Sequence, residues 1–403
     1  MTALETIRAA EAAYHMPVYG RQPVVFVRGE GVRLWDADGN EYLDFVAGIA
    51  VMSVGHSHPA VVEAIRSQAG MLAHVSNLYY TEPQVLLARR LHELLGWGKA
   101  FFANSGAEAN ECAVKLARRW QRERGRPERA GLVAALGSFH GRTVATLAAT
   151  GHPAKHEPFA PLPPELVHHV PLNDADALGS ALDAGIGGLL LEVVQGEGGI
   201  NIATPEYLKA ARELCDERGA LLIFDEVQTG LGRTGRWFGF QHAGVTPDVV
   251  TLAKALGGGL PIGACIAREE IADAFKPGDH ATTFGGGPVP CAAALAVLDV
   301  IERDDLVGNS EKMGELLVAR LREALDGSPA VEEVRGVGLL VGIELAGDFS
   351  RDVVDACREK GLLVNNVRPD MIRLSPPLIV SADDVERAVG ILSSVFEDLR
   401  GRV

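Results

Sequence analysis

The stretch LLIFDEVQTGLGRTGRWFGFQHAGVTPDVVTLAKALGGGLPIGA, residues 221–264, decides the fold. It holds two short apolar runs, Leu221–Phe224 and Val249–Ala253, and each is followed at once by a charged residue. Such runs are typical of buried parallel strands, and in α/β sheets ligands bind at the edge formed by the carboxyl ends of the strands. The sequence therefore predicts that Asp225 and Lys254 meet at one edge of the sheet.

Asp225 and Lys254 together indicate one kind of chemistry. Burial at the end of an apolar strand should lower the pKa of the Lys254 ammonium, which makes this lysine a candidate Schiff-base nucleophile toward an aldehyde. Asp225 would then keep a pyridinium nitrogen protonated, as pyridoxal phosphate requires when it acts as an electron sink. Because side chains alternate along a strand, we expect Val227 to share a face with Asp225 and to lie under the ring. The alternative is an ordinary buried salt bridge.

A second motif, NSGAEANE at residues 104–111, predicts an anion site. Ser105, with Glu108 three residues later, forms a capping box at the start of a helix. Gly106 and Ala107 leave the first backbone amides of that helix uncovered, and such amides bind phosphate. A plain capped helix is the alternative.

Other segments carry candidate residues for small anions. FHGRT, residues 139–143, places the lone guanidinium of Arg142 in a turn, where it is suited to a bidentate grip on a carboxylate, although a surface salt bridge is the alternative. Arg373 ends a short predicted strand just before two prolines. Thr282 and Thr283 precede a long predicted helix and would otherwise serve only as its cap.

The motifs NSGAEANE, FHGRT, LEVVQGEGG, FDEVQTGLGRTG, LAKALGGGLPIGA and TTFGGGPV resemble those of the fold-type-I pyridoxal phosphate aminotransferases that act on terminal amines, and most closely the acetylornithine aminotransferases. The likeness runs from about Val18 to the last predicted helix, and Val193 departs from it where a proline is common. The resemblance implies an α/β fold with a mostly parallel central sheet in a large domain, plus a small α+β domain formed from both termini. It also implies transamination of the terminal amine of N-acetylornithine with 2-oxoglutarate, in arginine biosynthesis.

The resemblance also assigns roles to residues of this chain. Phe139 would stack on the ring opposite Val227, and Gln228 would hydrogen-bond the phenolic oxygen. Thr283 would reach the cofactor phosphate of a neighbouring subunit, which implies a homodimer with shared active sites. The implied cofactor-binding residues are Ser105, Gly106, Ala107, Phe139, Asp225, Val227, Gln228, Lys254 and Thr283. The implied substrate-binding residues are Arg142, Glu197, Thr282 and Arg373.

The two substrates suggest a switch between Glu197 and Arg373. The resemblance pairs these residues, and our hypothesis is that Glu197 neutralises Arg373 while the amine donor is bound. Glu197 would then swing aside so that Arg373 can hold the α-carboxylate of glutamate or 2-oxoglutarate.

Composition is that of a soluble metabolic enzyme. The 403 residues are 47% hydrophobic, enough for a large core, and we expect segments 1–73, 74–298 and 299–403 to form an amino-terminal part, a large cofactor-binding domain and a carboxyl-terminal small domain. A net charge of −15 without basic runs argues against nucleic acid or anionic membrane as a partner. Five scattered cysteines without a CxxC motif suggest neither a disulfide framework nor a metal site. The amino terminus resembles no signal peptide, so we expect a cytoplasmic protein.

Several alternatives stay open. The donor could instead be ornithine, succinylornithine, 4-aminobutyrate or carrier-linked lysine. A pyridoxal phosphate aminomutase or decarboxylase, or a cofactor-binding protein without turnover, is more distant.

His56 and His58 have the spacing of a metal pair, but loop hydrogen bonding is the preferred interpretation. Gly336, Gly338 and Gly342 precede a strand-like segment rather than a helix, which argues against a dinucleotide site. A helix is expected over residues 266–275.

Overall fold

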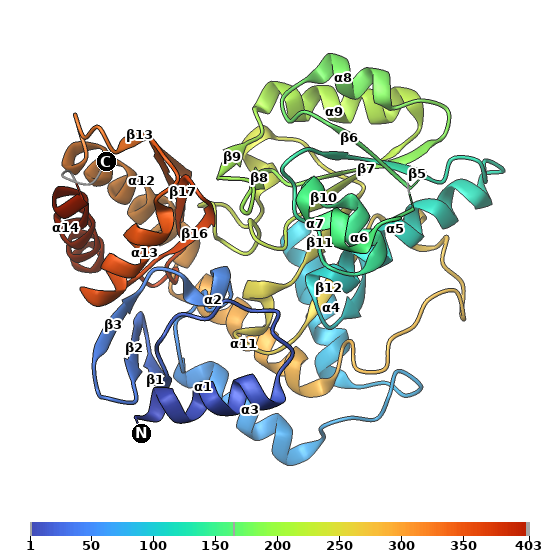
Figure 1. Cartoon of the computed structure of the whole chain (residues 1–403). Coiled ribbons are helices and arrows are strands. Elements are labelled where there is room, and N and C mark those ends of the chain that lie inside the picture. Colours follow the sequence, from blue (N-terminus) through green and yellow to red (C-terminus); the bar gives the residue numbers. More distant parts are fainter. Residues whose placement is uncertain (1, 164–165, 400–403) are drawn as a thin grey trace.

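The computed structural model describes residues 2–163 and 166–399, and a large sheet lies at the centre of this part of the chain (Figure 1). Its strands run in the order β4-β12-β11-β10-β7-β5-β6. In that order they are Lys99–Ala103, Gly263–Ala267, Val249–Leu252, Leu221–Asp225, Ile186–Leu191, Gly131–Ala135 and Val167–Val170. Strands β10, β11 and β7 are buried at every residue, which explains their continuous apolar sequences.

The strands from β11 to β6 are parallel to one another, as predicted, and β12 runs antiparallel to both β11 and β4. The helix expected over residues 266–275 is therefore wrong at its start, because Ile266 and Ala267 belong to β12. Helix α10 covers only Glu269–Ala272. The segment GACIA is apolar because every residue of β12 is buried, and an apolar run of this kind does not by itself distinguish a strand from part of a helix.

Helices cover the two faces of the large sheet (Figure 1). Helix α5, Gly106–Glu123, packs against β12, β11 and β4, while α9, Pro205–Arg218, packs against β10. The other helices of this region are α4 (Glu82–Leu95), α6 (Val144–Ala149), α7 (Pro153–His156), α8 (Ala175–Ala181) and the 3₁₀ segments η1 (Glu157–Phe159), η2 (Gly239–Ala243) and η3 (Lys254–Gly257). A hairpin of β8 (Val194–Gln195) and β9 (Asn201–Ile202) follows β7.

An amino-terminal segment and a carboxyl-terminal segment of the chain lie together in a second region (Figure 1). Strand β15 of the carboxyl-terminal part pairs in parallel with β3 of the amino-terminal part. The amino-terminal elements are α1 (Ala3–Tyr14), β1 (Phe26–Glu30), β2 (Arg33–Asp36), β3 (Glu41–Asp44), α2 (Ala47–Ala50) and α3 (Pro59–Met71). The carboxyl-terminal elements are α11 (Pro288–Arg303), α12 (Leu306–Ala324), β13 (Val331–Val337), β14 (Leu340–Leu345), α13 (Ser350–Glu359), β15 (Leu362–Leu363), β16 (Asn365–Arg368), β17 (Met371–Leu374) and α14 (Ala382–Leu399).

Strands β13, β14, β17 and β16 form a separate sheet in that order. Gly336, Gly338 and Gly342 lie in and around the β13–β14 hairpin. The proposed boundary at Leu298 falls inside α11, and residues 1 and 400–403 of the outer segments lie outside the described residues. No helix in the described ranges has the length and apolar character needed to cross a membrane.

Candidate active site

Asp225 and Lys254 lie at the same edge of the large sheet. Asp225 ends β10 and is in register with Thr251 of the parallel strand β11, and Lys254 follows two residues after β11 ends. Lys254 has a backbone φ of +35°, a value that residues with a side chain rarely adopt. Strain of this kind is common at functional sites.

A cavity of about 490 Å³ opens at this edge. Most of the residues that the sequence assigned to cofactor or substrate contribute to its wall. These are Ser105, Gly106, Ala107, Phe139, Arg142, Glu197, Asp225, Val227, Gln228 and Lys254. Arg373, Thr282 and Thr283 are not among the lining residues.

The Asp225 carboxylate is 4% exposed and is held by three groups. Its Oδ2 accepts a hydrogen bond of 2.7 Å from Nδ2 of Asn110 and lies 2.8 Å from Nδ1 of His140. Its Oδ1 accepts a hydrogen bond of 3.1 Å from the amide of Val227. The prediction missed Asn110 and His140, although both lie in motifs quoted above. Their only signal in the sequence was their place within these motifs.

Lys254 has the electrostatics expected of a nucleophilic amine. Burial and the nearby Arg373 guanidinium lower its pKa from 10.5 to about 8, and Glu197 and Asp225 oppose that shift.

A further carboxyl group that the sequence analysis did not assign to the site, that of Glu192, also lines the cavity, and burial raises its pKa to about 7. Glu192 accepts a hydrogen bond of 2.8 Å from the amide of Phe139.

Val227 lines the cavity, but the prediction gave the wrong structural reason for its position. Strand β10 ends at Asp225 and a turn follows, so the alternation of side chains along a strand does not place Val227. The turn is fixed by buried Glu226, whose carboxylate accepts hydrogen bonds of 3.0 and 2.9 Å from the amides of Gly239 and Phe240. A Cβ added at Gly106 would lie 2.8 Å from Val227, so the contact requires glycine.

The amino terminus of α5 provides the predicted helix start. Ser105 is its N-cap, and its hydroxyl accepts a hydrogen bond of 3.2 Å from the amide of Glu108. The expected capping box is only half formed, because the Glu108 carboxylate accepts from the amide of Asn104, at 2.8 Å, instead of from Ser105. As first-turn amides, those of Gly106 and Ala107 have no partner inside the helix. They face a cavity that could hold a phosphate.

The ring of Phe139 lies among cationic groups. The Arg142 guanidinium carbon is 5.5 Å from the ring centroid, and the Lys155 ammonium is 5.3 Å from it. Burial and the Arg142 charge lower the pKa of Lys155, while Glu197 opposes this shift. An anionic group in the cavity would therefore meet positive charge near Phe139.

Glu197 and Arg373 form an ion pair at the rim of the cavity. Nη1 of Arg373 donates to Oε1 of Glu197 at 2.6 Å and to the carbonyl of Gly196 at 3.0 Å. It also lies 3.4 Å from Oε1 of Gln228. Burial alone would raise the pKa of Glu197, yet Arg373 holds that pKa below its ordinary value. Arg373 is 1% exposed and does not line the cavity, whereas its partner Glu197 does.

Thr282 and Thr283 lie beside the cavity rather than in it. The Thr282 hydroxyl lies 3.3 Å from Nδ2 of Asn104, a residue of the cavity wall. Thr283 lines a separate small hollow with Asn77 and Phe284. Neither threonine caps the following helix, because the N-cap of α11 is Gly287.

The two histidines with metal-like spacing make local contacts. Nε2 of His56 lies 2.7 Å from Oδ2 of Asp44, and Nδ1 of His58 accepts a hydrogen bond of 3.3 Å from the amide of Ala60. Across the described ranges, no group of three or more histidine, cysteine, aspartate or glutamate residues is placed to hold a metal ion.

The donor set of the cavity fits pyridoxal phosphate. An amine of lowered pKa lies near a buried carboxylate, and the free amides of a helix start and an aromatic ring line the same space. Residues 15–396 match the family Aminotransferase class-III, and the chain belongs to this family of pyridoxal phosphate enzymes. The fold and the family expected from the sequence are thereby confirmed.

Among its relatives, the chain is similar to the acetylornithine aminotransferase of Caldanaerobacter subterraneus subsp. tengcongensis, with 50% identity over 97% of this chain and 99% of that protein. The acetylornithine aminotransferase of Streptomyces coelicolor is 52% identical over 94% of this chain and 92% of its own length. Among solved structures, the ornithine aminotransferase of Toxoplasma gondii superposes with a TM-score of 0.96 at 35% identity, over 100% of this chain and 97% of its own. The acetylornithine aminotransferase of Elizabethkingia anophelis gives 0.88 at 34% identity, over 99% and 100%.

Proposed function

We propose that this enzyme transfers the terminal amino group of N2-acetyl-L-ornithine to 2-oxoglutarate, giving N-acetyl-L-glutamate 5-semialdehyde and L-glutamate, a step of arginine biosynthesis. The observation that carries the proposal is that Lys254, Asp225 and Glu197 line one cavity, with Glu197 paired to Arg373. Relatives named acetylornithine aminotransferase at about half identity over nearly the whole chain support the choice of donor.

Pyridoxal phosphate, when bound, supplies an aldehyde that captures amines and a ring that accepts the electrons of a broken C–H bond. Lys254 would attach the cofactor and, once displaced by the substrate amine, would move a proton at the reacting carbon through its Nζ. A pKa of about 8 leaves part of this amine neutral near pH 7. The negative charge of Asp225 would hold a proton on the ring nitrogen, and three hydrogen-bond partners keep the carboxylate in place.

The remaining cavity residues would position the cofactor and the substrates. The amides of Gly106 and Ala107 would receive the phosphate, and Phe139 and Val227 would bound the ring. Gln228 would contact the phenolic oxygen. Arg142, exposed next to Phe139, would bind the α-carboxylate of the donor.

The ion pair between Glu197 and Arg373 suits an enzyme with two unlike substrates. While the pair is closed, Arg373 is neutralised and a donor without a second carboxylate fits the site. When Glu197 moves aside, Arg373 would hold the α-carboxylate of glutamate or 2-oxoglutarate. Glu197 is the more exposed partner and would be the one that moves.

We also infer a homodimer with shared sites. Thr283 lies outside the cavity of its own chain, in a loop whose Phe284 is exposed, and the nearby Leu78, Tyr79 and Tyr80 are exposed as well. An exposed apolar surface of this kind is typical of a subunit contact. Thr283 would then serve the phosphate of the partner subunit, and Thr282 would approach its substrate. A cytoplasmic location stays a prediction.

A panel of amine donors with 2-oxoglutarate tests the function. The proposal predicts that acetylornithine has the highest kcat/KM, with one glutamate formed for each donor consumed. A higher value for ornithine, succinylornithine, 4-aminobutyrate or carrier-linked lysine would overturn the choice of donor. Turnover without glutamate would instead indicate an aminomutase or a decarboxylase, and an absorbance spectrum that no amine changes would indicate a protein that only binds the cofactor.

A further inference from the structure

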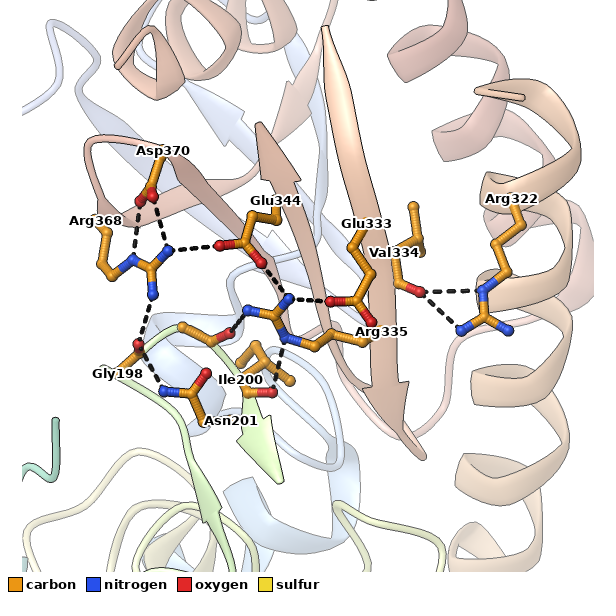
Figure 2. Close-up of polar contacts among 11 residues, drawn as sticks. Gly198, Ile200, Asn201, Arg322, Glu333, Val334, Arg335, Glu344, Arg368 and Asp370 are labelled. Atoms are coloured by element: carbon orange, nitrogen blue, oxygen red, sulfur yellow. Dashed lines mark hydrogen bonds and ion pairs between the residues drawn. The ribbon is translucent and has the colours of Figure 1, made fainter. Parts of the chain in front are cut away.

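The loop that carries Glu197 follows the large sheet in the chain, and side chains of the carboxyl-terminal sheet hold it in place. Residues 196–200 form the tip of the β8–β9 hairpin, which follows β7 of the large sheet. Two arginines of the carboxyl-terminal sheet, Arg335 on β13 and Arg368 at the end of β16, reach across to this tip (Figure 2).

These arginines bind three successive carbonyl groups that follow Glu197. Arg368 donates through Nη1 to the carbonyl of Gly198 at 3.3 Å. Arg335 donates through Nη2 to the carbonyl of Gly199 at 2.8 Å and through Nε to that of Ile200 at 3.2 Å. The backbone next to Glu197 is therefore fixed by side chains from outside the hairpin.

Acidic groups hold the two arginines in the orientation that these contacts need. Glu344 on β14 lies between them, accepting from Nη2 of Arg368 at 2.8 Å and pairing with Nη1 of Arg335 (Figure 2). Asp370 binds Arg368 through both carboxylate oxygens, at 2.8 and 2.7 Å. A guanidinium fixed in this way loses little freedom when it binds the loop.

The tip of the hairpin depends on such support. Ile200 has a φ of +57°, which is unfavourable for a β-branched residue, and Gly199 has a φ of +115°. The Ile200 side chain is fully buried with Val194 and Leu340, so the tip also packs on the carboxyl-terminal sheet.

From this arrangement we infer that Arg335 and Arg368 are positioning residues that hold Glu197 against Arg373 and so favour the terminal-amine donor over the α-amino acid. The inference rests on the proposed role of Glu197. We call Arg335 and Arg368 together the clamp. When the clamp is weakened, the loop that carries Glu197 leaves Arg373 more often, and glutamate gains access to the Arg373 guanidinium.

The test uses the cofactor-loaded enzyme and Arg335→Met, with Arg368→Met as a second variant because Arg368 is more exposed. The matched control is Arg322→Met, since Arg322 binds the carbonyl of Val334 on the far side of β13, at 2.8 and 3.0 Å (Figure 2). Half-reactions with glutamate and with acetylornithine are measured separately by absorbance. Amide hydrogen exchange of the peptide that contains residues 196–202 is measured in parallel.

We expect both clamp variants to exchange faster in that peptide and to raise the ratio of kcat/KM for glutamate over acetylornithine by about tenfold or more, because Arg368→Met removes one charge-assisted hydrogen bond to the tip and Arg335→Met removes two. The control should change neither. Equal losses with both substrates, or an equal shift in the control, would overturn the inference, because a general loss of folding lowers both rates together. If Glu197→Ala shifts the ratio and the clamp variants do not, the clamp is wrong and the switch stands. If Glu197→Ala leaves the ratio unchanged, the switch and the specificity role of the clamp are both wrong. If hydrogen exchange of the 196–202 peptide is also unchanged in Arg335→Met and Arg368→Met, the positioning role of the clamp is wrong as well.

Discussion

Oε1 of Glu197 lies 2.6 Å from Nη1 of Arg373, and this contact joins the β8–β9 hairpin to β17 of the carboxyl-terminal sheet. Arg373 is almost fully buried, and one of its nitrogens, Nη2, has no hydrogen-bond partner among the described residues. A buried guanidinium with a spare donor is well suited to receive a second carboxylate. The pair thus links the architecture of the chain to its use of two substrates.

Replacing Glu197 with alanine should change the order of substrates. Arg373 would be free of its partner, so the half-reaction with glutamate should improve relative to acetylornithine by about tenfold. Separate half-reaction measurements give the ratio. Glu213→Ala, an exposed residue of α9, is the control and should leave it unchanged. An unaltered ratio in Glu197→Ala would contradict the switch.

Replacing Asp225 with asparagine should reduce kcat by roughly 10²–10⁴-fold, the range of a lost acid or base group, because a neutral amide cannot hold a proton on the ring nitrogen. Asparagine keeps the shape of the side chain, so the fold should survive. Steady-state rates at saturating cofactor measure the effect. Asp248→Asn is the matched control, since Asp248 lies at the opposite end of β10 and β11 and binds the amide of Leu222 at 2.8 Å. It should alter stability but not kcat, and a similar fall in kcat there would sink the assignment.

The lowered pKa of Lys254 predicts a pH-dependent stability of the cofactor-free protein. Below pH 8 the lysine is charged in both states, so the full penalty of burying the charge is present. Between pH 8 and 10.5 only the unfolded state holds the proton, and stability rises with pH. Lys254→Met should therefore be more stable than the parent at pH 7, by on the order of 3 kcal/mol, and the difference should shrink toward pH 10.5.

Urea unfolding of both proteins at several pH values measures this difference. Lys209→Met, an exposed lysine of α9, should show no such trend. A parent protein as stable as Lys254→Met at pH 7 would show that burial does not penalise the lysine.

Subunit mixing tests whether Thr283 serves the neighbouring site. Thr283→Ala should weaken cofactor binding, and Lys254→Ala should abolish activity. In a hybrid dimer, one site combines the intact lysine of the first chain with the intact threonine of the second. Refolded mixtures should recover activity at low cofactor concentration that neither variant has alone. Absence of recovery, in a species shown to be dimeric by light scattering, would place Thr283 in the site of its own chain.

The sequence was sufficient where function depends on strand ends. Two apolar runs placed Asp225 and Lys254 correctly, because parallel strands expose their carboxyl ends at one edge. It also gave the start of α5 at Ser105, because helix caps are local signals.

The sequence failed where position depends on partners that are distant in the chain. Val227 reaches the cavity through a turn held by Glu226, whose partner amide at Gly239 lies 13 residues further along the chain, and Asp225 is fixed by Asn110, 115 residues earlier. The end of strand β12 was predicted to be helical, because local periodicity does not show that this buried segment pairs with strands on both sides.

The covalent attachment of the cofactor is the most direct test of the account. Purified protein saturated with pyridoxal phosphate should be reduced with borohydride, digested and examined by peptide mass spectrometry. The account predicts a phosphopyridoxyl group on Lys254 alone, and its loss in Lys254→Ala. An unmodified Lys254 peptide, or modification of another lysine instead, would contradict the assignment of the active site.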